Sequence, residues 1–118
     1  MTYKSQQHKT IFEKAVKKKD KSNRALIAAM YLLTADNKLW QIMQHHIEQN
    51  RIDFDGVKLN VITENAYTLY CAAKDMYFNT DFLSISDIAD TSLISPKIFE
   101  VICTAVKIRR IGLDNNEG

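Results

Sequence analysis

Glycine and proline are scarce in this sequence, with three and one among 118 residues. Sandwiches and barrels need many tight turns, which these residues usually mark, so their scarcity favours helices. The two cysteines, Cys71 and Cys103, lie in apolar helical patterns and form neither a disulfide framework nor a CxxC motif. The longest apolar run, residues 25–33, is too short for a membrane span, and the polar N-terminus lacks the apolar segment of a secretory signal. We therefore expect a cytoplasmic protein with no membrane partner.

Motifs for catalysis, cofactors and metals are also lacking. The only histidines are His8, His45 and His46, and adjacent helical residues point about 100° apart, so the last two are poor co-ligands. The chain has no GxSxG, HxE or glycine-rich phosphate motif, and apolar surroundings suppress the reactivity of a thiol. Asp87 and Asp90 lie one turn apart and could form a carboxylate pair, with capping and surface positions as the alternative. We predict that the protein is not an enzyme and uses no cofactor or metal.

The charge is unevenly distributed along a chain of ordinary composition and of one domain's length. Residues 1–24 have a net charge of +6 and the remaining 94 residues a net charge of −4. Such polarity is a mild signal for nucleic acid or an acidic partner, whereas a basic run is also typical of a solvated linker. The candidate contact residues are Lys17, Lys18, Lys19, Lys21 and Arg24.

Apolar periodicity and capping residues predict five to six helices. The residues at 25–33 are apolar around most of the helix, which indicates a central, buried helix. Ser84 and Asp87 have capping-box spacing, Ser95 with Pro96 marks the start of the last helix, and Gly112 could end it in the left-handed region. The expected helices cover about residues 5–18, 22–33, 38–50, 64–78, 85–90 and 96–111.

A β-hairpin is predicted at about residues 51–61, between the third and fourth helices. Apolar residues alternate there on either side of Asp55-Gly56, a favoured two-residue turn. This turn would pair Phe54 with Val57 and Ile52 with Leu59, all on one inward face. Because two strands alone are marginal, the hairpin should pack on helices or pair through its edge with a second copy, giving a homodimer.

The fold class is therefore mainly α: a compact bundle of about five to six helices with one β-hairpin. We expect a single helical domain over residues 1–113 and a disordered tail at 114–118.

Residues 84–102 resemble the helix-turn-helix pattern of bacterial regulators. Ala89 fits the small position between two helices, and the first turn of the second helix would face the major groove with Ser95 and Lys97. Two features oppose this interpretation: Leu93 occupies the place where the turn usually has glycine, and Glu100 adds a negative charge to the DNA-facing side. An ordinary helical corner is the alternative.

A stripe of Tyr67, Tyr70 and Tyr77 follows one side of the predicted fourth helix. Tyrosine is enriched in interfaces, so the stripe is a candidate partner-binding surface. The core-facing edge of the helix is the alternative, because Leu69 and Met76 lie alongside.

About 100 residues of the chain resemble an uncharacterised family of small proteins from Gram-positive bacteria, some of them on phages and other mobile elements. The matching residues are His8-x-x-x-Phe12, Ala25 to Trp40, the hairpin region 52–59, Tyr67 to Ala73 and Ala105 to Arg109. The resemblance implies a stand-alone domain and no functional residue. Together with the missing chemistry, it leads us to expect a non-enzymatic protein that binds a protein partner, as a phage- or host-encoded modulator. A helix-turn-helix DNA-binding regulator is the alternative.

Overall fold

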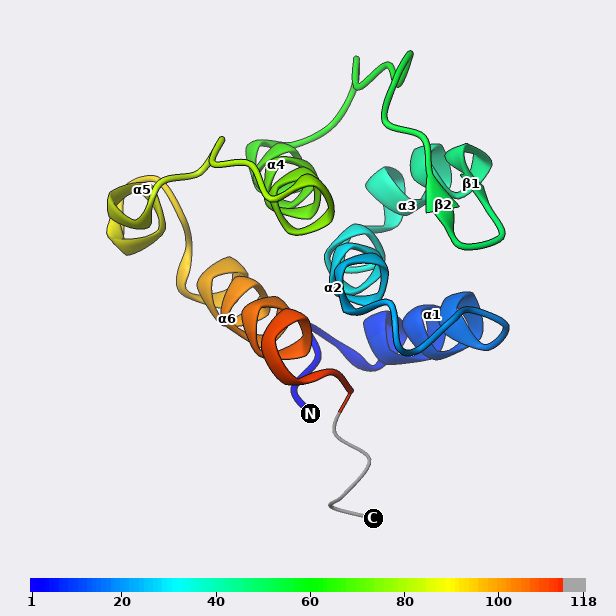
Figure 1. Cartoon of the computed structure of the whole chain (residues 1–118). Coiled ribbons are helices and arrows are strands. Elements are labelled where there is room, and N and C mark those ends of the chain that lie inside the picture. Colours follow the sequence, from blue (N-terminus) through cyan, green and yellow to red (C-terminus); the bar gives the residue numbers. More distant parts are fainter. Residues whose placement is uncertain (114–118) are drawn as a thin grey trace.

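The structure, a computed structural model, describes residues 1–113. These residues form six α-helices, one short 3-10 helix and one two-stranded antiparallel sheet, which confirms the predicted fold class (Figure 1). The predicted tail at 114–118 lies outside the described residues. The elements are α1 (Gln6–Val16), α2 (Arg24–Leu33), α3 (Asn37–Met43), η1 (Gln44–His46), β1 (Ile47–Glu48), β2 (Arg51–Ile52), α4 (Glu64–Phe78), α5 (Ile85–Ala89) and α6 (Pro96–Ile111).

Helix α2 is the centre of the fold, as its apolar sequence predicts. Helices α1, α3, α4 and α6 pack around it, and Figure 1 shows it in the middle of the other helices. Every residue from Leu26 to Leu33 is buried. The helix begins two residues later than expected, because the side chain of Asn23 accepts a hydrogen bond from the backbone N–H of Leu26 and caps the first turn.

His8 on α1 is one of the few buried polar side chains, with 2% of its surface exposed. Its Nδ1 accepts a hydrogen bond from the backbone N–H of Lys4 at 3.0 Å, so Nε2 bears the proton and donates to the carbonyl of Tyr31 at 2.8 Å. Burial lowers the pKa of His8 to about 4. The neutral imidazole therefore fastens α1 to the central helix without a buried charge.

The hairpin lies between α3 and α4 as predicted, but its strands lie earlier in the sequence than predicted and do not reverse at Asp55-Gly56. Ile47 pairs with Ile52 and Glu48 with Arg51, so the chain reverses at residues 49–50 and not at Asp55-Gly56. Gln49 adopts a φ of 54°, the left-handed conformation that such a tight turn needs. The predicted third helix, about residues 38–50, accordingly ends at Met43, and residues 57–61 contain no strand.

Contacts with α4 account for this register. The hydroxyl of Tyr77 accepts a hydrogen bond from the backbone N–H of Ile52 at 3.1 Å, and the Phe54 ring packs against Tyr70 and Tyr77. Ile52 and Phe54 are buried, whereas the predicted inward residues Val57 and Leu59 are only partly buried against the core. Each strand has two residues, so little free edge remains for the homodimer predicted there.

The ends of α4 and α6 are joined by Arg109. Helix α4 ends at Asn79 in the left-handed conformation, with a φ of 59°. The Arg109 guanidinium donates to the Asn79 side-chain oxygen at 2.7 Å and to the Met76 carbonyl at 3.3 Å. This supplies donors to the negative end of the α4 dipole. Gly112 caps α6 at a φ of 83°, but its ψ of −176° lies outside the predicted left-handed helical region.

Candidate functional site

The segment from α4 to α6 is held in place by a buried carboxylate, Asp75, on the last turn of α4. Its two oxygens accept three hydrogen bonds: from the hydroxyl of Thr80 at 2.6 Å and from the backbone N–H groups of Phe82 and Leu83, each at 2.9 Å. The side chain is 8% exposed. Asp75 thus folds the connecting loop over the end of α4 and fixes where α5 begins.

Helix α5 begins with the predicted capping box. The Ser84 hydroxyl accepts from the backbone N–H of Asp87 at 3.0 Å, and the Asp87 carboxylate accepts from the backbone N–H of Ser84 at 3.0 Å. The Asp90 carboxylate accepts from the N–H and the hydroxyl of Ser92, and these bonds lower the pKa of Asp90. The carboxylates of Asp87 and Asp90 thus make separate local hydrogen bonds. This agrees with capping and surface positions, the alternative to a carboxylate pair.

An apolar groove lies between α5 and the first two turns of α6. The residues that line this α5–α6 groove come from α5, from the connecting turn and from α6: Ile88, Ala89, Thr91, Ile94, Pro96 and Phe99. Ile94 is buried beneath it and Ile98 is fixed in the core, whereas Phe99 is 42% exposed. The groove is therefore an accessible apolar hollow on a well-packed base.

Further exposed apolar side chains lie beside the groove. Ile85 is 87% exposed and precedes Ala89 by one helical turn, so the two share a face of α5. Leu93, in the turn between the helices, is 51% exposed. Apolar residues that stay in water at several neighbouring positions mark a binding surface more often than single exposed ones do.

The charges near the groove are mainly negative. Residues 84–102, which supply both sides of the groove, contain three acidic side chains and one lysine, a net charge of −2 in a chain whose overall charge is +2. Asp90 and Glu100 are exposed, as is Lys97, and Asp87 is partly exposed. This local excess of negative charge is the reverse of what a phosphate backbone requires.

Arg24, the last predicted contact residue of the basic run, lies at the opposite end of α6 from Ser95 and Lys97. Arg24 donates from its guanidinium to the carbonyl of Arg110 at 2.7 Å, in the last turn of that helix, whereas Ser95 caps its first turn. A helix of 16 residues separates these ends by about 24 Å. Arg24 is thus too far away to add its positive charge to the site formed by Ser95 and Lys97.

Within the basic run, the side chains are largely exposed. The Lys21 ammonium donates to the carbonyls of Lys17 and Lys19, at 3.1 and 3.0 Å, and so closes the turn that follows α1. Lys17 and Lys18 are exposed and Lys19 is partly exposed. These contacts agree with the linker alternative for Lys21.

The predicted tyrosine stripe divides between core and surface. Tyr70 and Tyr77 pack on Phe54, with ring centroids 5.6 and 5.7 Å apart, and Tyr77 also supports the hairpin. Tyr67 is 56% exposed and stacks on Tyr70 at 6.4 Å. Of these three residues, Tyr67 is the one with most of its surface exposed to a partner.

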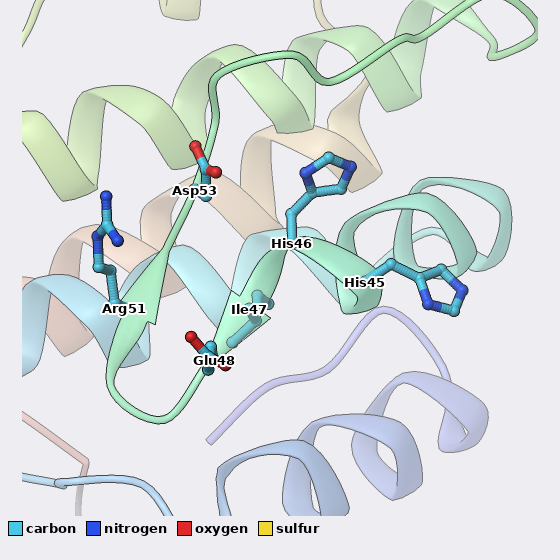
Figure 2. A pocket seen from close by; sticks show the side chains of 6 residues that line it. All are labelled: His45, His46, Ile47, Glu48, Arg51 and Asp53. Atoms are coloured by element: carbon cyan, nitrogen blue, oxygen red, sulfur yellow. The ribbon is translucent and has the colours of Figure 1, made fainter.

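A second, polar hollow lies beside the hairpin and is lined by His45, His46, Ile47, Glu48, Arg51 and Asp53 (Figure 2). The rings of His45 and His46 point in different directions in Figure 2, as expected for neighbouring residues in a helical turn. Asp53 is fixed by its backbone N–H, which donates to the carbonyl of His46 at 2.8 Å. Over residues 1–113, no group of three or more His, Cys, Asp or Glu side chains is placed to hold a metal ion.

Both cysteines are free and partly buried. Burial raises the pKa of the Cys71 thiol, which agrees with the expectation of an unreactive side chain at that position.

Comparisons of the chain with protein-family models, curated proteins and solved structures found no match. The resemblance to small Gram-positive and phage proteins stays a prediction from the sequence. In the described part of the chain, no helix is both long enough and apolar enough to span a membrane.

Sequence reasoning identified residues 84–102 as the segment of interest but did not predict the α5–α6 groove. In the sequence, Ile85 and Leu93 look like ordinary members of an apolar pattern, so nothing indicates that they are exposed. The available signal was the length of α5: a helix of five residues can turn only one short face to the core.

Proposed function

We propose that this protein is a non-enzymatic binding module that holds a protein partner on the α5–α6 groove. The observation that supports this most directly is the exposed apolar surface of Ile85, Leu93 and Phe99 around a groove with a well-packed base. Interfaces are built around apolar anchors that fill such pockets. We also propose that the protein is a modulator of phage or host origin and that it is cytoplasmic. Both parts of the proposal are based on the sequence.

Capture of the partner from a lysate of the native host tests this function. We expect the wild-type chain to retain a stoichiometric protein, and the double variant Ala89→Asp/Phe99→Asp to retain at least tenfold less, because two carboxylates enter the apolar groove. Val61→Asp is the matched control: this residue is 74% exposed in the loop before α4, outside the groove. A partner held equally by the double variant, or no stoichiometric partner, would contradict the proposal.

DNA reading by residues 84–102 is the second candidate function. The observation that favours it is the accessible first turn of α6, where Pro96 and Lys97 are exposed. The negative charge of the surrounding residues opposes it. If this candidate is correct, duplex DNA should bind in a salt-dependent manner and Lys97→Glu should weaken that binding at least tenfold. Equal mobility shifts for the wild-type chain and the variant would exclude the site.

A further inference from the structure

We infer that the partner presents a basic amphipathic helix to the α5–α6 groove, an inference that rests on the function proposed above. The occupant would place apolar side chains on Ile88, Ala89 and Phe99 and turn lysine or arginine residues toward the acidic surroundings. The shape of the groove, the state of its backbone and its charge each support this occupant.

The groove has the shape of a helix-binding site. It lies between two helices, and small Ala89 leaves room between the larger side chains of Ile88 and Phe99. Amphipathic helices dock into such grooves through apolar residues spaced three or four apart. Ile85, one turn before Ala89, extends the apolar surface beyond the groove.

The backbone around the groove leaves no place for a partner strand. The capping box at Ser84 occupies the start of α5, and Ser95 and Pro96 begin α6, with the Ser95 hydroxyl accepting from the N–H of Ile98. In the turn between the helices, the N–H groups of Leu93 and Ile94 donate to the carbonyl of Asp90. A partner is thus recognised by its side chains, which favours a helix over an extended peptide.

The negative charge near the groove favours a partner helix with lysine or arginine residues beside its apolar face. Asp90 and Glu100 are exposed, Asp87 is partly exposed, and Lys97 is the single opposing charge in residues 84–102. The hydrogen bonds from Ser92 lower the pKa of Asp90, which keeps its carboxylate ionised at neutral pH. Opposite charges at the rim of an interface steer association and exclude partners of like charge.

A second copy of this chain does not supply such a helix. Its most basic helix, α6, has a net charge of +3 and uses most of its apolar residues in its own core: Ile98, Val101, Ile102, Ala105 and Ile108. Beyond Phe99 of the groove itself, α6 exposes the large apolar residues Val106 and Ile111, which are five positions apart and therefore form no stripe along one face. The occupant is therefore a helix of another protein.

Two designed helical peptides test the inference by fluorescence anisotropy. Both have leucine at i, i+3, i+4 and i+7, and they differ only in a polar face of lysine or of glutamate. We expect the full chain to bind the lysine peptide at least tenfold more tightly, and high salt to reduce this difference. The overall charge of +2 would favour the glutamate peptide, so a preference for lysine reports the local acidic surface.

Variants locate the peptide site. Ala89→Asp/Phe99→Asp should weaken binding of the lysine peptide at least tenfold, whereas Val61→Asp should leave it unchanged. Equal binding of the two peptides, tight binding by the double variant, or no binding of either peptide would overturn the inference. So would dimerisation of the chain that the double variant abolishes, because the occupant would then be a second copy. Groove-dependent capture of a protein partner alongside any of the peptide failures would leave the proposed function standing.

Discussion

Replacing Asp75 by alanine should lower the free energy of unfolding by about 3 kcal/mol. The carboxylate is nearly buried and accepts hydrogen bonds from Thr80, Phe82 and Leu83. Without it, the backbone N–H groups of Phe82 and Leu83 lose their acceptors at partly buried hydrogen bonds, and each costs free energy unless water reaches it. Urea unfolding followed through the single tryptophan, Trp40, measures the change.

The controls separate the hydrogen bonds from the charge. Asp75→Asn keeps the size of the side chain but replaces one acceptor oxygen by a donor NH₂ group, and it should cost about 1–2 kcal/mol. Asp81→Asn removes the same charge from an exposed position in the same loop and should change the free energy of unfolding by less than about 0.5 kcal/mol. If both Asp75 variants unfold like the wild type, the loop does not depend on this carboxylate.

Acidification should destabilise the protein through His8. Burial lowers the pKa of His8 to about 4 in the folded state, against 6.5 for an unperturbed imidazole. Unfolding therefore takes up a proton between these values, so the contribution is complete above pH 6.5 and lost as the pH falls toward 4. We expect a loss of roughly 2–3 kcal/mol over this range, measured by urea unfolding at a series of pH values.

His8→Gln isolates this contribution, because glutamine stays neutral and can still donate to the Tyr31 carbonyl. Carboxylates titrate in both proteins, so the difference between the two pH profiles reports His8 alone. The variant should lose roughly 2–3 kcal/mol less than the wild type on acidification. His45→Gln, at an exposed position, should keep the wild-type profile. Parallel profiles for the wild type and His8→Gln would contradict the assignment.

The helices could be predicted because their signals are local. Ser84 and Asp87 form a capping box within four residues, and Ser95 with Pro96 starts α6 at the expected position. The burial of α2 follows from an apolar run that leaves no polar side to face water. Each of these features depends on residues a turn or less apart.

The hairpin register could not be predicted because distant residues decide it. Asp55-Gly56 does form a turn, with a φ of 73° at Gly56, but Phe54 packs on α4 and does not pair with Val57. The hydrogen bond from Ile52 to Tyr77 spans 25 positions along the chain. Local turn preference was correct for the turn and wrong for the strands, since tertiary packing determines register.

The candidate site was predictable only in part. The sequence identified the short α5 and the start of α6, but not which of their apolar residues remain in water. Ile85 and Ile88 are three residues apart, yet Ile88 packs partly against the core and Ile85 is 87% exposed. That division depends on where Asp75 fixes the loop before α5, which no local pattern encodes.

The two ends of the described chain meet at the far end of α6 from the groove. Met1 and Thr2 line one hollow together with Ile108 and Gly112, and Figure 1 shows the N-terminus beside the end of α6. The Tyr31 hydroxyl fastens this N-terminal segment by donating to the Thr2 carbonyl. The first and last described residues of the fold therefore lie close together, an arrangement that suits circular permutation. A short linker would join them, and new termini would be placed in the loop at 57–61. Both the join and the new termini would leave α5, the turn and α6 continuous.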